Sequence, residues 1–235
     1  MSLLHFVLPT ELTFVKRTFT VSDIYTYIFK PASPLYWRAG QHGMIEIKKP
    51  NGKVSRRMFS LSSSPSEHTV SITTHWLGEE KASDFKKALW NLQPGDKAKL
   101  RGPIGSMYLR ETGKEHVFIA GGIGITPFRA MIVQAVSDNP DMKGTLLYAN
   151  RDQASVLFRG ELERLSSRLQ KFQIVFVTKP DQITASEIRN ACDNLHDTIF
   201  YVAGPPSMIK AYKKIMKELG VKKSQIKNDL FLGSK

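Results

Sequence analysis

Two hydrophobic patterns follow each other along the chain. Up to about residue 110, short segments rich in β-branched and aromatic residues alternate with turn residues, which predicts short strands. We expect strands over residues 12–20, 24–30, 43–48, 56–62, 69–74 and 97–101. A helix is expected over residues 82–91, with Phe85, Leu89 and Leu92 on one face. Short strands at this spacing are typical of an antiparallel barrel or sandwich.

From about residue 114, strands alternate with helical patterns, which is typical of βαβ units and a mostly parallel sheet. Strands are expected over residues 117–120, 145–149, 173–178 and 198–203. Two helical stripes are interpreted as core faces, and they contain Phe158, Leu162, Leu165 and Leu169, then Met208, Ile209, Tyr212, Ile215, Met216 and Leu219. The polar link at 111–114 predicts two domains: an antiparallel β-barrel over residues 1–110 and an α/β doubly wound parallel sheet over residues 111–235.

Composition limits the chemistry that the chain can perform alone. Its 235 residues are 41% hydrophobic, which is enough for a buried core. The single cysteine, Cys192, excludes an internal disulfide, a four-cysteine zinc site and a chain-borne iron–sulfur cluster. The six histidines show no metal-ligand spacing, so no metal site is predicted. Redox chemistry would therefore need a bound cofactor.

The chain is strongly basic, with 34 Lys and Arg against 21 Asp and Glu and a formal charge of +13. A polyanionic partner therefore has to be considered. Both halves are basic and no arm is singled out, which weakens a nucleic-acid-binding hypothesis. The densest lysine cluster is interpreted as a solvated helix face, with a dedicated binding patch as the alternative; it contains Lys210, Lys213, Lys214, Lys217, Lys222, Lys223 and Lys227.

No targeting or membrane segment is expected. Residues 1–9 have no basic leader and only a short apolar run, so we predict a cytoplasmic location. Residues 117–136 are apolar over a membrane-like length, but they contain three glycines, Pro127 and Arg129. That content favours a turn between two elements of a globular domain.

The strongest local motif is an apolar strand, a glycine turn and a helix over residues 117–128. Glycines let the backbone approach a pyrophosphate, and a helix start offers free N–H groups to it. Thr126 is expected to be the N-cap and Pro127 the first helical residue. Pro127 stands where the third glycine of the dinucleotide fingerprint would be, so a purely structural turn remains an alternative.

A second motif lies at residues 56–65, where a strand runs into a serine-rich loop. Arg57 could neutralise a phosphate, Phe59 could stack on a ring and Ser60 could hydrogen-bond a heterocycle. Taken alone, an ordinary amphipathic strand explains the same residues.

The order of these motifs resembles the ferredoxin-NADP reductase-like flavoprotein family over nearly the whole chain. Arg57-Met58-Phe59-Ser60 is similar to its flavin signature, which implies Arg57 on the FAD pyrophosphate, Phe59 against the flavin and Ser60 near N5. Lys81-Ala82-Ser83 resembles the second flavin segment, although Glu80 replaces the usual glycine. Gly102-Pro103-Ile104-Gly105 resembles the turn that closes the flavin barrel.

On the nucleotide side, residues 121–127 resemble the family's nicotinamide loop. Residues 203–208 resemble its Cys-Gly-Pro-Pro-x-Met segment, with Ala203 in place of the cysteine. Phe231 is similar to the C-terminal aromatic near the flavin, or it is a tail residue packed on the barrel. Arg151, and Thr178-Lys179 after the third strand, favour NADPH over NADH.

The resemblance implies an FAD-dependent oxidoreductase that takes a hydride from NAD(P)H and passes electrons to a separate acceptor. That acceptor is a ferredoxin, a flavodoxin, an oxygenase component or a small molecule, and the charge favours an acidic carrier protein. A non-catalytic flavin- or nucleotide-binding module and a nucleic-acid-binding protein are the alternatives. The expected catalytic residues are Ser60 and Phe231. The expected cofactor contacts are Arg57, Met58, Phe59, Ser60, Thr74, His75, Lys81, Ala82, Ser83, Gly122, Gly124, Thr126, Arg151, Thr178, Lys179, Gly204 and Pro205.

Overall fold

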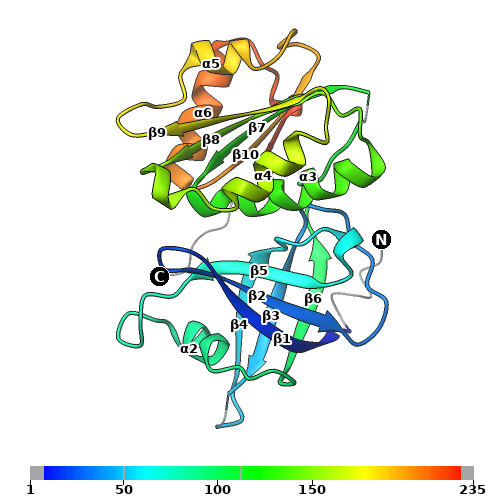
Figure 1. The fold of residues 1–235 in the computed structure, drawn as a ribbon, viewed down its shortest axis with the longest axis vertical. Coiled ribbons are helices and arrows are strands. Elements are labelled where there is room, and N and C mark those ends of the chain that lie inside the picture. Colours follow the sequence, from blue (N-terminus) through cyan, green and yellow to red (C-terminus); the bar gives the residue numbers. More distant parts are fainter. Residues whose placement is uncertain (1–7, 50, 112, 229–235) are drawn as a thin grey trace.

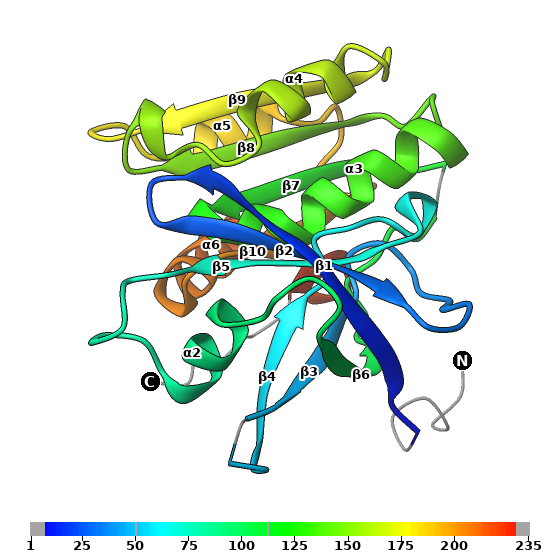
Figure 2. The same ribbon diagram turned by 60° about the horizontal axis from the view of Figure 1, so that its bottom comes forward.

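Two separate β-sheets organise the chain in a computed structural model that describes residues 8–49, 51–111 and 113–228 (Figure 1). The first is a six-stranded antiparallel sheet in the order β4-β3-β6-β1-β2-β5. Its strands are β1 (Thr10–Val21), β2 (Ile24–Pro31), β3 (His42–Lys48), β4 (Val54–Ser60), β5 (Val70–His75) and β6 (Lys97–Ile104). The sheet curls into a half-barrel (Figure 2), which confirms the predicted antiparallel β-lobe.

The second sheet is parallel and has five strands in the order β11-β10-β7-β8-β9. Its strands are β7 (Glu115–Gly121), β8 (Gly144–Asn150), β9 (Phe172–Thr178), β10 (Thr198–Ala203) and β11 (Ile226–Asn228). Helices α3 (Thr126–Asp138) and α4 (Arg159–Ser166) cover one face, and α5 (Ala185–Asn190) and α6 (Pro206–Glu218) cover the other (Figure 1). This arrangement confirms the doubly wound sheet. The exact boundary at residues 110/111 stays a prediction.

The six-stranded lobe has its own apolar core, which includes Phe29 and Ile45. Helix α2 (Asp84–Trp90) buries Phe85 and Leu89 in this core. Ser83 caps the helix, because its hydroxyl accepts the Lys86 N–H at 3.5 Å. The helix therefore holds the loop before it, residues 76–83, close to the curled sheet.

Helix α3 is buried from two sides. One side packs on the parallel sheet, and the other meets the six-stranded lobe, whose Ala39 and Met107 share a core with Phe128 and Met131 of α3. At Gly40 (φ 96°) an added Cβ would lie 2.2 Å from the Met131 Cε. The helix can approach the lobe this closely because residue 40 has no side chain.

Some elements differ from the sequence-based expectation. Helix α4 begins at Arg159, so Phe158 precedes it in a left-handed conformation (φ 58°) and Leu169 follows it. Leu169 is nevertheless buried and Phe158 packs against the same core. Helix α5 and strand β11 were not predicted, because six and three residues are too few to show a hydrophobic period. No helix among the described residues is long and apolar enough to cross a membrane.

His116 on β7 should make stability depend on pH. Its side chain is 1% exposed, neither ring nitrogen has a hydrogen-bond partner among the described residues, and burial lowers its pKa to about 4. The unfolded chain binds this proton near pH 6.5, so stability is complete above that pH and is lost as the pH falls toward 4. We expect the free energy of unfolding to drop by about 2 kcal/mol between pH 7 and pH 5, measured by urea titration.

The variant His116→Phe should lose this part of the pH dependence, while His196→Gln at an exposed position should keep it. An unchanged slope in His116→Phe would show that other groups cause the acid sensitivity.

Candidate functional site

The candidate nucleotide site lies at the edge of the parallel sheet where β7 and β10 end. These neighbouring strands are parallel and in register from Glu115–Thr198 to Ala120–Ala203. The chain leaves β7 toward α3 on one face of the sheet and leaves β10 toward α6 on the other (Figure 1). Ligands of open α/β sheets bind at such a switch point, outside the carboxyl ends of the strands. This position alone marks the edge as the candidate nucleotide site.

Glycines allow the two loops at this edge to lie directly against each other. A Cβ added at Gly124 would lie 2.4 Å from the Ala203 carbonyl oxygen, and one at Gly121 would lie 2.3 Å from the Met208 sulfur. Gly204 has φ 156°. A Cβ at Gly122 would meet no atom within 4 Å, so that side of the loop is open. Gly121, Gly124 and Gly204 therefore allow close packing, while Gly122 borders open space.

The expected cap at Thr126 is wrong. A 3₁₀ turn, Gly122–Ile125, runs directly into α3, so Thr126 already has helical angles (φ −56°, ψ −47°) and Ile125 occupies the N-cap position. No side chain caps this helix start. Pro127 lies in the first turn, where its missing N–H leaves no hydrogen bond unmade. Since Thr126 is also buried, its contact with a nucleotide stays a prediction.

Tyr148, which the sequence analysis did not single out, joins two loops at this edge. Its hydroxyl donates to the Gly122 carbonyl at 3.1 Å and accepts the Leu157 N–H at 3.2 Å. Burial raises the pKa of this hydroxyl, so it stays protonated. A buried tyrosine usually needs a partner for its hydroxyl, and this general rule was the one available signal.

The residues expected to select NADPH lie at the same edge of the sheet. Thr178 ends β9 and is in register with Asn150 at the end of β8, directly before Arg151. Arg151 is exposed and pairs with Asp152 at 3.0 Å, while the Thr178 hydroxyl accepts from Gln153 at 3.3 Å. Lys179 is exposed. Two cations and a hydroxyl thus lie at or directly after the ends of two neighbouring strands.

Strand β4 presents its two arginines differently. Arg56 pairs with the buried Glu46 at 2.6 Å. Among the described residues Arg57 has no carboxylate partner and donates only to the backbone oxygen of Arg56, at 3.0 Å. Met58 and Ser60 are half-buried. Successive residues of a strand point to opposite sides, so the free cation and Phe59 share one side.

Helix α2 and strand β4 bring the two predicted flavin segments together. The Phe59 ring lies 5.5 Å from the Phe85 ring of α2, between centroids. Ser83, at the start of α2, and Ala82 are half-buried, and Lys81 is exposed. Figure 2 shows α2 beside the end of β4.

The end of β5 lies next to the same loop. Thr74 is buried, and the His75 ring nitrogen pairs with Asp23 at 3.0 Å. The following residue, Trp76, stacks on Trp90 of α2 with ring centroids 4.5 Å apart. His75 is thus a half-exposed residue at a strand end, and contact with a flavin stays a prediction for it and for Thr74. Phe231 lies outside the described residues, and Pro205 is exposed beside Gly204.

Comparison with known proteins identifies the nucleotide lobe. Residues 118–214 match the family model of the oxidoreductase NAD-binding domain. Flavohemoprotein A from Dictyostelium discoideum is 28% identical over 228 residues, which cover 89% of this chain and 57% of that protein. The chain spans about half the length of the curated relatives it matches.

Two solved structures share the whole fold. The flavohem-like FAD/NAD-binding domain of nitric oxide dioxygenase from Vibrio cholerae has a TM-score of 0.81 at 21% identity, with 94% of this chain and 98% of that chain covered. Ferredoxin-NADP⁺ reductase from Plasmodium falciparum has a TM-score of 0.78 at 18% identity, with 95% and 96% covered. The chain therefore has the two-lobed fold of these two structures, and residues 118–214 of its second lobe resemble an oxidoreductase NAD-binding domain.

The close approach at Gly124 can be tested. In Gly124→Ala the new methyl group would press on the Ala203 carbonyl, so the two loops must separate. We expect the free energy of unfolding to fall by about 1–3 kcal/mol, measured by urea titration. Gly113→Ala, where a Cβ meets no atom within 4 Å, should change it by less than about 0.5 kcal/mol. Equal stability of the two variants would show that the loops are not tightly packed.

Proposed function

We propose that this protein is an FAD-dependent oxidoreductase that takes a hydride from NAD(P)H and passes the electrons to a separate acceptor. The observation that carries the proposal is the occurrence, in one chain, of two half-sites. One is the glycine-lined edge between β7 and β10, and the other is β4 beside α2, where Arg57 has no carboxylate partner in the part of the chain that the structure describes.

The residues of the first lobe fit FAD. A pyrophosphate carries negative charge, and Arg57 has no carboxylate among the described residues to neutralise it, whereas Arg56 is already paired with Glu46. Lys81 is exposed just before α2 and would add a positive charge there, next to the Asp84 carboxylate of the first turn. Phe59 would border the flavin ring and Ser60 would hydrogen-bond near its N5. When bound, FAD would accept two electrons as a hydride and release them singly.

The residues of the second lobe would hold the nicotinamide nucleotide. The open side of Gly122 lets a pyrophosphate approach the backbone before α3, and Tyr148 holds that loop through the Gly122 carbonyl. Gly204 and Pro205 would border the nicotinamide. Ala203 supplies no thiol there, so orientation of the ring depends on the shape of the two loops.

NADPH is the donor that we propose, ahead of NADH. Arg151 and Lys179 are exposed cations near the Thr178 hydroxyl, and such a group suits a 2′-phosphate. No carboxylate ends β8, where an acidic residue would bind a free ribose hydroxyl.

A second candidate function is a flavin- or nucleotide-binding module without turnover, and Ala203 in place of a thiol is the observation that favours it. Steady NADPH oxidation with an artificial acceptor would exclude this candidate. The cytoplasmic location stays a prediction.

The proposed function predicts a visible spectrum that responds to nucleotide. Under anaerobic conditions the protein with added FAD should show an oxidised-flavin band, which NADPH should bleach at lower concentration than NADH. In Arg57→Gln we expect FAD affinity to fall about 10- to 100-fold, since a charge-assisted hydrogen bond contributes about 1.5–3 kcal/mol.

Arg56→Gln is the matched control, because the neighbouring Arg56 already pairs with Glu46, and its FAD affinity should stay within about threefold. Absence of flavin binding would contradict the assignment of β4. Binding without bleaching by either nucleotide would support the non-catalytic module.

The positive charge of the chain favours an acidic electron acceptor. With a net charge of +13, the protein should reduce an acidic carrier, such as a ferredoxin or flavodoxin, faster at low ionic strength. We expect the second-order rate constant for reduction of the acidic carrier to fall about tenfold between 20 and 300 mM salt. The rate of ferricyanide reduction should not follow the same curve. If the rate constant with the acidic carrier does not change with salt concentration, electrostatic docking is wrong.

A further inference from the structure

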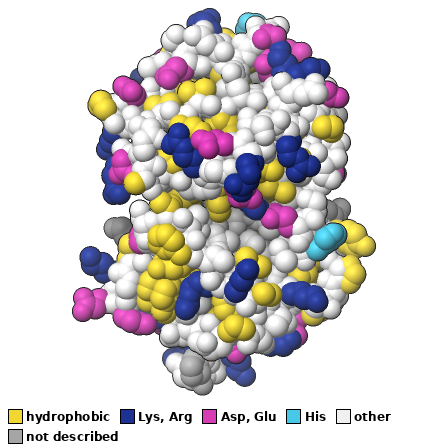
Figure 3. All heavy atoms as spheres, in the orientation of Figure 1, with side chains coloured by type: hydrophobic (Ala, Val, Ile, Leu, Met, Phe, Trp, Pro, Cys, Tyr) yellow, Lys and Arg dark blue, Asp and Glu magenta, His cyan; other side chains and the backbone are white. Residues whose placement is uncertain are grey.

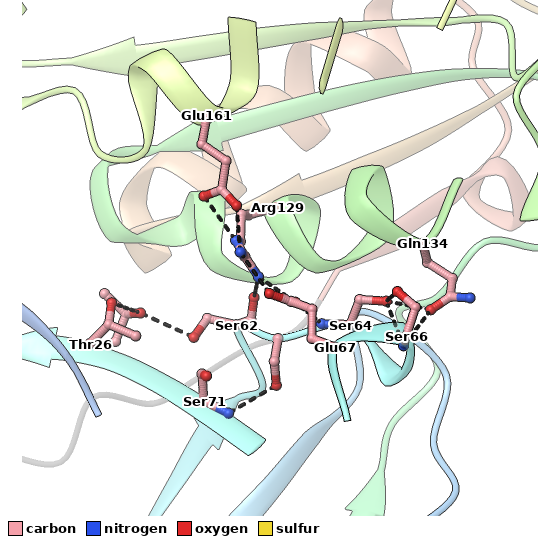
Figure 4. Close-up of polar contacts among 11 residues, drawn as sticks. Thr26, Ser62, Ser64, Ser66, Glu67, Ser71, Arg129, Gln134 and Glu161 are labelled. Carbon is pink, nitrogen blue, oxygen red and sulfur yellow. Dashed lines mark hydrogen bonds and ion pairs between the residues drawn. The ribbon is translucent and has the colours of Figure 1, made fainter. Parts of the chain in front are cut away.

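Arg129 of α3 connects three segments of the chain (Figure 4). Its guanidinium donates to both carboxylate oxygens of Glu67 at 2.6 and 2.9 Å, to the Ser62 carbonyl at 2.9 Å and to Glu161 of α4 at 3.2 Å. The side chain is 13% exposed. Ser62 and Glu67 belong to the six-stranded lobe, so this cluster crosses the seam between the lobes.

A second polar contact lies beside it. Gln134, also on α3, accepts the Ser66 N–H through its side-chain oxygen at 3.3 Å and contacts the Ser64 hydroxyl (Figure 4). Glu67 in addition accepts the Ser64 N–H at 2.6 Å. The loop from Ser62 to Glu67 is therefore held by α3 at two points about one and a half helical turns apart.

The residues of this cluster lie close in sequence to both half-sites. Ser62 comes two residues after Ser60, the end of the candidate flavin strand β4. Arg129 comes five residues after Gly124 in the candidate nucleotide loop. The contact thus joins the two half-sites through short stretches of rigid backbone.

The seam next to this cluster is hollow. A cavity of about 530 Å³ borders the cluster, and its lining includes Thr18, Phe158, Glu67, Arg129 and Glu161. Burial lowers the pKa of Arg129, but its hydrogen bonds to the Glu67 and Glu161 carboxylates outweigh that effect and raise the pKa, so the guanidinium stays charged. A planar guanidinium on α3 with acceptors on two other segments allows little sliding between the three.

We propose that Arg129 is a positioning residue that sets the distance between the nicotinamide and flavin half-sites, an inference that rests on the proposed hydride transfer. Hydride transfer requires donor and acceptor atoms to come within about 3–3.5 Å, and a 1 Å misplacement can cost about 10²-fold in rate. Each half-site lies within one lobe, so loosening the seam should change the rate of transfer more than either binding step.

The test compares three variants with the wild type. The triple variant Arg129→Met, Glu67→Gln, Glu161→Gln removes the cluster without leaving a buried carboxylate unpaired, and the glutamine at 67 can still accept the Ser64 N–H. Arg129→Lys keeps the charge but cannot reach all three acceptors. Glu163→Gln is the control, because Glu163 pairs with Arg159 within α4.

In the triple variant we expect kcat for NADPH oxidation to fall 10- to 100-fold, while KM for NADPH and the Kd for FAD change less than threefold. Arg129→Lys should lie between it and the wild type, and Glu163→Gln should stay within twofold of the wild type. Spin labels at Lys48→Cys and Lys217→Cys, in a Cys192→Ser background, give a readout independent of turnover. Their distance distribution should broaden in the triple variant only.

In an active wild type, an unchanged kcat in the triple variant would overturn the proposal, and so would a distance distribution as narrow as in the wild type. Equal losses in kcat and in FAD retention would also overturn it, because they would indicate general unfolding. A wild type that binds FAD but is not bleached by nucleotide would instead refute the proposed function, so the two failures are distinguishable.

Discussion

Burial of helix α3 on two sides is the constraint on which the rest of the structure depends. The helix covers one face of the parallel sheet and also supports the half-barrel, where Met131 packs against Gly40. Seven of its residues are buried, so a charged side chain at its seam needs partners of opposite charge. Arg129 finds them in Glu67 and Glu161, one on each side of the seam. The same helix begins at the glycine turn, so its placement also sets the nucleotide edge.

Glycine has two separate functions at this edge. Gly121 and Gly124 allow the loops after β7 and β10 to touch, because the Met208 sulfur and the Ala203 carbonyl occupy the space that a Cβ would need. Gly122 instead borders open space and has φ 51°, a conformation that favours glycine. A single run of glycines in the sequence thus combines loop packing with access for a ligand.

Figure 3 shows basic, acidic and apolar side chains interspersed over one face of the molecule, without a continuous basic stripe there.

Much of the fold could be predicted from local pattern. Strands β7 and β10 are apolar after their first one or two residues, as expected for strands covered on both faces, and their prediction differs from the structure by at most two residues at either end. Thr126 was predicted wrongly because a 3₁₀ turn extends α3 backwards, and turns of this kind have no hydrophobic period. The two arginines of β4 could not be told apart from sequence alone, since only the position of Glu46 on β3 decides which one is neutralised.

The sequence by itself determined the two kinds of sheet, the turn before α3 and the residue types that can meet phosphate, because these depend on spacing over a few residues. Only the tertiary structure decided that Arg57 has no carboxylate partner among the described residues, that Tyr148 bridges Gly122 and Leu157, and that Arg129 crosses the seam. Each of those contacts joins segments that are tens of residues apart or depends on which neighbour a charge finds. Hydrophobic periodicity reports which side of an element is buried, but it carries no information on what that side will touch.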